Sequence, residues 1–368
     1  MRARLEMGVR VKISTESFNA AMNLVRESVV IAGHTDFIAD LGPRRRRGEK
    51  GVLARHLPAL RAGGLTAVFD HIGGDAPYYT VYPANGVMVA DPLRSSLEAL
   101  QHVKAEVDAS HETMIARDCG DIRLAHDTDR VAFVLCLEGA APIGNDLSML
   151  RIFYDLGVRC IGLTHNQRNL LGDGIAVGAS GGLTSFGKDA IRDMEALGIT
   201  VDVSHLNTEG FWDTVSIAQR PVIASHSNAS AIHGHPRNLD DDQIRALAGT
   251  GGMIGLHAMT TLISSGEQDY FRTLLAHAEH IGSLVGPQYV GLGPDIMPDW
   301  DEQTYREIWA PARDLADLTF SYPSEFDGLD KVANLAAGLL EVGFSGTEVS
   351  GILGANWLRV FDQSWQAR

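Results

Sequence analysis

The sequence predicts an α/β protein built as a (β/α)₈ TIM-type barrel, with extra N- and C-terminal helices and a long loop after the last strand. Three observations lead to this prediction. Eight short apolar segments recur along the 368 residues, and each stops at a polar residue. Amphipathic segments with helical periodicity lie between them. The apolar segments are continuous runs, which is typical of strands buried on both faces of a parallel sheet.

The eight predicted strands are rich in β-branched or apolar residues and are bounded by turn signals. They are VVIAGHTD (29–36), LTAVFDHI (65–72), VAFVLCLEG (131–139), VRCIGLTHN (158–166), ITVDVSH (199–205), PVIASHS (221–227), GGMIGLHA (251–258) and YVGLGPD (289–295). Because the carboxyl ends of barrel strands converge on one mouth, the polar residues at these ends are expected to meet there.

The predicted helices place apolar residues at intervals of three and four, as one buried helix face requires. Those between the strands include residues 96–118, 146–157, 184–198, 207–219, 240–251 and 270–286. A helix-like stretch at 18–27 precedes the first strand, and stretches at 329–343 and 345–361 follow the last one. We expect these three to be extra helices packed on the barrel.

Residues 297–324 do not fit the alternation of strands and helices. The segment mixes aromatic with charged residues, and its aromatic residues include Trp300, Tyr305, Trp309, Phe320 and Tyr322. Such loops after barrel strands shape the pocket, so it is predicted to be an inserted active-site loop. No linker rich in Pro, Gly or Ser interrupts the chain, and residues 1–368 are therefore predicted to form a single barrel domain.

Composition and charge exclude several kinds of partner. The formal net charge of −15 would repel nucleic acid and anionic membranes. No run of signal-peptide type is present, and none approaches the roughly 20 apolar residues that span a bilayer. Three cysteines, an odd number without metal-type spacing, fit reduced thiols. We therefore expect a cytoplasmic protein with no nucleic-acid and no membrane partner.

One basic run, Arg44 to Arg47, stands out in this acidic chain. Gly and Pro border it, which favours a solvated loop. Since short basic runs are weak signals, a phosphate or carboxylate contact is the alternative.

Imidazole and carboxylate side chains stand at the predicted strand ends. They are His34, Asp36, Glu138, His165, His205, His226 and Asp295. Each one alone has an ordinary explanation, such as a hydrogen-bonded histidine, a turn aspartate or a capping glutamate. Together they would repel or desolvate one another without a cation, because like charges in a shared site disfavour ionisation. Imidazole with carboxylate suits zinc or a related divalent ion, so the sequence predicts a metal site at this mouth.

Other histidines are weaker candidates. His257 ends the seventh predicted strand and is expected to face the pocket, where it could contact the substrate. His71 ends the second predicted strand and is weaker still. His277 and His280 lie within the helical segment 270–286 and are predicted to be helix-surface or packing residues.

The candidate residues lie in longer stretches that resemble the membrane (renal-type) dipeptidases, peptidase family M19, zinc enzymes of the amidohydrolase superfamily with a (β/α)₈ fold. The matching stretches are GHTDF, HLPALRAGGL, LEGAAPIGNDLSMLRIFYDLGVRCIGLTHNQRNLLGDG, GGLTSFGKDAIRDMEALGITVDVSH, PVIASHSNASAIHGHPRNLDDDQIRALAGTGGMIGL, YVGLGPD and YPSEFDGLDKVANLAAGLLEVGF. With the helix that follows the last of them, they extend over residues 29–295 and 322–361. The resemblance is thus long and ordered.

The resemblance implies a site for two divalent metal ions, with zinc expected before manganese or cobalt. His34 and Asp36 would bind the first ion, and His205 with His226 would bind the second. Glu138 would bridge the two ions.

The same resemblance implies hydrolysis of a dipeptide's amide bond by a metal-bridged hydroxide. Asp295 would lie beside the first metal, take the proton of the attacking water and deliver it to the leaving amine. His165 would contact the substrate and stabilise charge on the tetrahedral intermediate. Arg237 would hold the substrate's free carboxylate through two parallel hydrogen bonds. A loop arginine that caps a helix is the alternative for Arg237.

The chain departs from the family pattern around the pocket. Relatives usually continue the last strand with a sequence of the Asp-Phe-Asp-Gly type, whereas Asp295 is followed here by Ile296, Met297 and Pro298. His257 stands where relatives more often place asparagine or another residue before an aromatic one. The predicted metal ligands of the family are all present, but the residues predicted to line the pocket differ.

Three functions follow as hypotheses. The first is a dipeptidase, which could accept a D-residue at the C-terminal position. The second is a hydrolase of the same mechanism that acts on a non-standard amino-acid amide or conjugate in a specialised pathway. The third is a metal-binding homologue without catalysis, against which the retained Asp295 and His165 argue. Family members commonly form dimers, so the resemblance makes a homodimer a possible assembly, although nothing in the sequence marks an interface.

Overall fold

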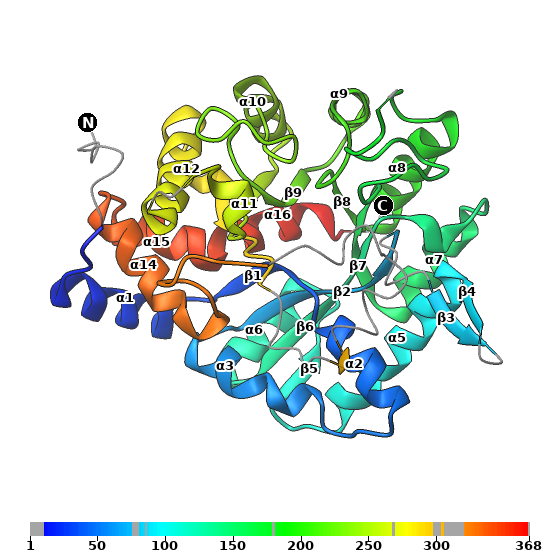
Figure 1. The fold of residues 1–368 in the computed structure, drawn as a ribbon, viewed down its shortest axis with the longest axis horizontal. Helices are drawn as coiled ribbons and strands as arrows, with labels where there is room; N and C mark the ends of the chain where they lie inside the picture. The colour runs from blue at the N-terminus through cyan, green and yellow to red at the C-terminus, as the bar shows by residue number, and fades with distance from the viewer. Residues whose placement is uncertain are drawn as a thin grey trace.

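The computed structural model describes residues 11–75, 81–84, 87–178, 181–266, 269–296, 303–304 and 320–366. Eight parallel strands form its centre: β1 (Ile31–Thr35), β2 (Ala67–Gly74), β6 (Val131–Glu138), β7 (Val158–Gly162), β8 (Thr200–Asp202), β9 (Val222–Ser227), β10 (Met253–Leu256) and β11 (Val290–Leu292). Strand β1 pairs with β2 and β11, and β2 pairs with β6, which closes the sheet into a barrel. The predicted (β/α)₈ barrel is therefore confirmed, and each strand overlaps a predicted segment (Figure 1).

Helices surround the barrel (Figure 1). They are α1 (Thr15–Glu27), α2 (Phe37–Arg46), α3 (Leu57–Ala62), α5 (Pro92–Asp108), α6 (Cys119–Asp127), α7 (Ser148–Leu156), α8 (Ser185–Leu197), α9 (Thr208–Ile217), α10 (Asp241–Gly249), α11 (Thr260–Ile263), α12 (Tyr270–Leu284), α14 (Val332–Glu341), α15 (Gly346–Ser350) and α16 (Asn356–Ser364). The extra helices expected before the first strand and after the last one are confirmed as α1 and as α14 to α16.

Local sequence signals fix where several of these helices start and stop. The side chains of Thr184, Asn207 and Asp240 each accept a hydrogen bond from the backbone N–H three residues on, which begins α8, α9 and α10. Helices α7 and α8 end at Gly157 and Gly198, whose left-handed φ values of 114° and 83° suit glycine.

Aromatic side chains of α16 and of Trp365, which follows it, fill the barrel interior. Trp357 is fully buried, and its indole Nε1 donates a hydrogen bond to the carbonyl oxygen of Leu292 at 3.1 Å. Trp365 Nε1 donates to the carbonyl oxygen of Arg159, near the start of β7, at 3.1 Å. Gly33 makes room for this packing, because a Cβ atom there would lie 2.2 Å from the Trp357 ring. The interior is thus packed from the amino-terminal side, and the polar side chains gather at the carboxyl ends of the strands.

The prediction of one helix over residues 96–118 is wrong. Helix α5 ends at Asp108, and residues Thr113–Ile115 form a ninth strand, β5, which pairs in parallel with the first residues of β6. A three-residue apolar run looks like one more turn of an amphipathic helix, so periodicity did not separate the two. A short antiparallel hairpin, β3 (Val81–Ala84) and β4 (Val87–Ala90), was also not predicted.

The prediction that Arg44 to Arg47 form a solvated loop is also wrong. Helix α2 continues through Arg46, and Arg44 is only 5% exposed. The Arg44 guanidinium bonds to Asp40, one turn earlier, and Arg45 bonds to Glu106 on α5. Asp40 within the same helix and Glu106 from a distant part of the chain thus pair with Arg44 and Arg45, so this part of the run is helical and ion-paired, while Arg46 stays exposed.

Two further expectations have different outcomes. The three cysteines are free, as predicted, and the structure shows that they are also buried. Within the predicted loop 297–324 only residues 303–304 and 320–324 are described, so Trp300, Tyr305 and Trp309 lie outside the described residues. None of the helices in the described ranges combines the length and apolarity that a membrane span requires.

Candidate metal centre

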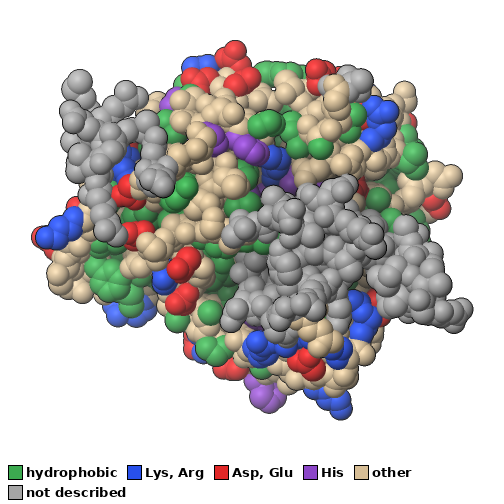
Figure 2. All heavy atoms as spheres, viewed as in Figure 1, with side chains coloured by type: hydrophobic (Ala, Val, Ile, Leu, Met, Phe, Trp, Pro, Cys, Tyr) green, Lys and Arg blue, Asp and Glu red, His purple; other side chains and the backbone are tan. Residues whose placement is uncertain are grey.

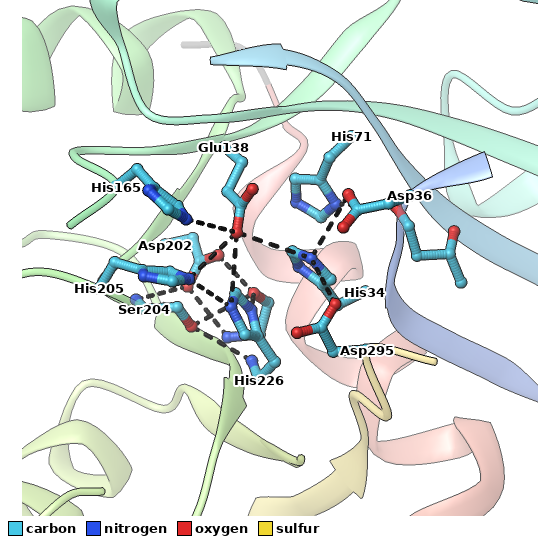
Figure 3. Close-up of polar contacts among 12 residues, drawn as sticks. His34, Asp36, His71, Glu138, His165, Asp202, Ser204, His205, His226 and Asp295 are labelled. Carbon is cyan, nitrogen blue, oxygen red and sulfur yellow. Dashed lines mark hydrogen bonds and ion pairs between the residues drawn. The ribbon is translucent and has the colours of Figure 1, made fainter. Parts of the chain in front are cut away.

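Side chains of metal-ligand type meet at the carboxyl-terminal mouth of the barrel (Figure 3). His34 and His226 lie within β1 and β9, and Glu138 is the last residue of β6. Loops that directly follow strands supply Asp36, His165, His205, His257 and Asp295. Each of these eight side chains is buried. The structure thus brings the seven predicted strand-end residues together and adds His257 to the group.

Glu138 lies at the centre of the group. Its Oε1 is 3.1 Å from Nε2 of His205, 3.7 Å from Nε2 of His226 and 3.8 Å from Nε2 of His34. Figure 3 shows Glu138 between His165 and His205 on one side and His34 with Asp36 on the other. Its carboxylate is therefore placed to serve two neighbouring groups of donors.

The first group of donors centres on His205 and His226. Together with Glu138 they offer ligand atoms that all lie within 4.8 Å of one another. His205 Nδ1 donates to the Asn166 Oδ1 at 2.7 Å, and His226 Nδ1 donates to the Ser225 hydroxyl at 2.8 Å. Both Nε2 atoms are therefore unprotonated and carry a lone pair, and the two atoms face each other across 2.8 Å. Two facing lone pairs repel, whereas a cation bound by both would be held strongly.

The second group of donors centres on His34. Its Nε2 lies 3.5 Å from Oδ1 of Asp295 and 3.7 Å from Oδ1 of Asp36, beyond hydrogen-bonding distance. Neither ring nitrogen of His34 has a hydrogen-bond partner, and neither does Oε2 of Glu138. A buried polar atom left unpaired costs about 1–3 kcal/mol. A divalent cation would satisfy these atoms, so the donor set fits such an ion.

Electrostatics leads to the same conclusion. Burial, followed by the charge of Asp36, raises the pKa of Glu138 well above its usual range. Burial alone would lower the pKa of His34, but Asp295, Asp36 and Glu138 outweigh it and raise that pKa to about 10. Burial lowers the pKa values of His205 and His226 well below the usual range. Three carboxyl groups, those of Asp36, Glu138 and Asp295, thus surround one positively charged imidazole, that of His34. A bound metal ion would supply the further positive charge that these groups need.

Asp202, in β8, holds the His226 side of the centre in place. Its carboxylate accepts the Ser225 hydroxyl and the backbone N–H groups of Ser225 and Ser204, the last two at 3.0 and 2.9 Å. Because the Ser225 hydroxyl points its hydrogen at Asp202, its oxygen is free to accept from His226 Nδ1. This chain of hydrogen bonds fixes the tautomer of His226 and the direction of its Nε2.

We expect the Asp202→Asn variant to bind metal at the Glu138–His205–His226 group about 10- to 100-fold more weakly, because a loosened outer partner misorients the ligand. Calorimetric titration of the metal-free protein measures this change. Asp213→Asn is the matched control, since Asp213 bonds to Lys188 and to the Leu183 backbone instead. Equal weakening in both variants would contradict the assigned role of Asp202.

Asp295 is fixed by two contacts, one through its side chain and one through its backbone. Its Oδ2 lies 3.0 Å from Nε2 of His257. The backbone N–H of Met259 donates to His257 Nδ1 at 3.0 Å, so the hydrogen of this imidazole is on Nε2 and points at Asp295. The Tyr322 hydroxyl donates to the Asp295 carbonyl oxygen at 3.1 Å, and the residue has a left-handed φ of 51°. Strained backbone at a non-glycine residue is typical of functional sites.

His257 was expected to face the pocket as a substrate contact, and the structure places it against Asp295. Burial would raise the pKa of Asp295, but His34 and His257 outweigh it and lower that pKa to about 2. Asp295 is therefore a carboxylate at neutral pH.

His165 and Arg237 line the other side of the mouth. His165 Nε2 lies 3.9 Å from Oε1 of Glu138, and burial with the charge of Arg237 lowers the pKa of His165 to about 3. Arg237 lies in the loop after β9, and its Nη2 donates to the His226 carbonyl oxygen at 3.4 Å. Burial lowers the pKa of Arg237 to about 10, so the guanidinium stays charged. In the space-filling view, histidine and basic side chains reach the surface of the face shown (Figure 2).

Several supporting residues did not emerge from the sequence. Asp75, after β2, accepts hydrogen bonds from the backbone of Ala141 and His165 and from the Asn169 amide, at 2.6, 3.3 and 2.6 Å. Burial raises the pKa of Asp75 to about 6. One signal for Asp202 was present, because an acid stands inside the apolar run ITVDVSH.

Comparisons with known proteins agree with this architecture. The family described as membrane dipeptidase (peptidase family M19) matches residues 18–307. An uncharacterized protein in the pqqA 5' region of Klebsiella pneumoniae is 32% identical, over 69% of this chain and 93% of its own length. Dipeptidase verJ of Clonostachys rogersoniana is 26% identical, over 96% of this chain and 88% of its own length.

Solved structures are similar in fold. Among them is a metallo peptidase from Rhodobacter sphaeroides liganded with a phosphinate mimic of the dipeptide L-Ala-D-Ala. The TM-score is 0.74 at 23% identity, and the match covers 92% of this chain and all of that chain.

Proposed function

The chain belongs to the membrane dipeptidase family, peptidase family M19, and from this membership we propose that it is a hydrolase with two divalent metal ions, zinc foremost, that cleaves the amide bond of dipeptides. One observation carries the proposal. The Nε2 atoms of His205 and His226 face each other across 2.8 Å beside Glu138, an arrangement that a bound cation would stabilise.

Two groups of residues would hold the ions. Glu138, His205 and His226 would bind one of them. His34 and Asp36 would bind the other, with Glu138 shared between the two. Imidazole and carboxylate donors suit zinc. When bound, two such ions lower the pKa of a water molecule toward neutrality and polarise the scissile carbonyl.

Asp295 is the proposed general base and, in the second half of the reaction, the general acid. Its carboxylate is ionised, lies 3.5 Å from His34 and so borders the first metal position. It would accept the proton of the attacking water and pass it to the leaving amine. The Nε2 hydrogen of His257 holds Oδ2, which leaves Oδ1 to carry that proton. In this arrangement His257 is a positioning residue.

His165 and Arg237 are the proposed substrate contacts. His165 is neutral and can donate a hydrogen bond to the oxygen on which negative charge develops. Arg237 can engage the substrate carboxylate through two parallel hydrogen bonds. A C-terminal D-residue is included among the substrates because the Rhodobacter sphaeroides relative in fold holds a mimic of L-Ala-D-Ala.

We expect protein stripped with a chelator and reloaded with zinc to release free amino acids from members of a panel of L,L- and L,D-dipeptides, while the stripped protein releases none. The same dipeptides with an amidated C-terminus should be cleaved about 10- to 100-fold less efficiently, since a charged hydrogen bond contributes about 1.5–3 kcal/mol. The Arg237→Gln variant should lose this discrimination.

Other outcomes separate the alternatives. No release from any dipeptide by protein with two bound ions would contradict the dipeptidase proposal and favour another amide, because Ile296, Met297 and Pro298 follow Asp295 in place of the family sequence. Metal content without hydrolysis of any amide would favour a metal-binding homologue.

A further inference from the structure

His71, in β2, borders the same cluster although the ligand set proposed above does not include it. The side chain is fully buried, and its ring stacks on His34 with 3.9 Å between centroids and 24° between planes (Figure 3). His34, Asp36 and His71 offer ligand atoms that all lie within 4.8 Å of one another. The group formed by Glu138, His205 and His226 meets the same distance limit.

The hydrogen bonding of His71 leaves one nitrogen available. Its Nδ1 lies 3.4 Å from the Thr35 carbonyl oxygen, whereas Nε2 has no hydrogen-bond partner. A carbonyl oxygen only accepts, so Nδ1 carries the hydrogen and Nε2 presents a lone pair. Metal-ligating histidines commonly donate their other N–H to a backbone carbonyl, and His71 has this arrangement.

Other buried histidines show that an unpaired nitrogen is not the rule in this protein. His277 uses both nitrogens, with the backbone N–H of Ala229 and the carbonyl oxygen of Ile263 each at 3.1 Å. His257 likewise pairs both nitrogens, with Met259 and Asp295. Among the described residues, His102 on α5 also has an unpaired buried nitrogen, but it belongs to no such group of donors. The unpaired nitrogens of His34 and His71 therefore mark a shared site.

We propose that His71 Nε2 is a ligand of the first metal ion, which would then be held by two imidazoles, those of His34 and His71, together with Asp36 and Glu138. This inference rests on the two-metal centre proposed above and specifies its composition. A second imidazole shifts the preference of the site among metal ions. Imidazole ligands suit zinc and cobalt, whereas oxygen ligands suit manganese and magnesium. The first site is accordingly selective for Zn²⁺ and Co²⁺ over Mn²⁺.

The test is metal binding by the purified full-length chain. Stripped wild type, His71→Gln and His71→Phe are titrated with Zn²⁺, Co²⁺ and Mn²⁺ by calorimetry, and the Co²⁺ absorption spectrum is recorded. Wild type is expected to bind two ions. Both variants should lose at least about tenfold in Zn²⁺ affinity at one site, because even an outer partner of a ligand is worth that much. Their Co²⁺ spectrum should change at that site, and the other site should stay as in wild type.

Controls keep the outcomes distinct. His277→Gln removes an equally buried imidazole away from the centre and should bind both ions like wild type. His71→Phe keeps a ring against His34, and circular dichroism of the stripped proteins shows whether each variant is folded. If the variants do not fold, wild type with isotope-labelled histidine and NMR-active cadmium decides: His34, His71, His205 and His226 should all couple to the metal, and absence of coupling for His71 overturns the inference.

Two results would contradict it in different ways. Two tightly bound ions and an unchanged Co²⁺ spectrum in folded His71 variants would overturn the role of His71 and leave the proposed function standing. A wild type that binds no metal would overturn both.

Discussion

The Asp295→Asn variant is expected to keep its metal ions and to lose turnover by about 10² to 10⁴-fold, the usual contribution of a general acid–base group. Asparagine has the same shape, and its amide oxygen can still accept the Nε2 hydrogen of His257, which lies 3.0 Å from Oδ2 in the native protein. It cannot take a proton from water at neutral pH. The loss should therefore fall on kcat, while metal content stays near that of wild type.

The assay compares initial rates of amino-acid release at saturating dipeptide with metal content measured on the same samples. Asp241→Asn is the matched control, because Asp241 forms an equivalent pair with His280 outside the centre, with 2.7 Å between Oδ1 and Nε2. That variant should turn over like wild type. Full activity of Asp295→Asn would remove Asp295 from the chemistry, and loss of metal in it would assign Asp295 to metal binding rather than to proton transfer.

The barrel was predictable because burial on both faces leaves a clear trace in each strand. Runs such as VAFVLCLEG cannot be amphipathic surface strands, and helical segments separate them. Strand β5 was missed because Thr113–Ile115 is too short to show its period. The burial of Arg44 was missed because its pair with Asp40 forms only once α2 is helical, and the pair of Arg45 with Glu106 forms only once α2 and α5 lie together.

The ligand candidates were predictable for a related reason. A barrel brings the carboxyl ends of its strands together, so position at a strand end nearly fixes position in space. His34, Glu138 and His226 are examples. No comparable rule locates the residues that orient the ligands. Asp202 acts through Ser225, and Asp75 acts through the backbone of His165, so their roles appear only in the hydrogen bonds of the folded chain.

The pocket was the least predictable part. His257 stands at a strand end like the ligands, yet its Nε2 hydrogen points to Asp295 because the Met259 backbone occupies its other nitrogen. The tautomer that decides this role depends on one backbone N–H group. Sequence position alone therefore indicates where such a residue lies and not what it contacts.

The Glu138→Gln variant is expected to lose both metal ions and, with them, activity. The Oε1 atom lies between 3.1 and 3.9 Å from Nε2 of four imidazoles, those of His34, His165, His205 and His226. A neutral amide supplies one oxygen and no charge, so it cannot bridge two cations. We expect at least about a tenfold loss of affinity for each ion, measured by calorimetric titration of stripped protein.

The stripped form of the same variant should behave in the opposite way. Because burial and Asp36 raise the pKa of Glu138 well above its usual range, the ionised group opposes folding at neutral pH when no cation is present. The glutamine variant, which carries no ionisable group at this position, should therefore be more stable than wild type in the metal-free state. Thermal melts should show this as a reversal: the melting temperature of the variant lies above that of wild type in the stripped proteins and below it in the zinc-loaded proteins.

Glu106→Gln is the contrasting control. The Glu106 carboxylate binds Arg45 and the backbone of Gly51 and Leu53, so its loss should lower both melting temperatures and leave metal binding intact. Two tightly bound ions in Glu138→Gln would show that this carboxylate holds neither of them.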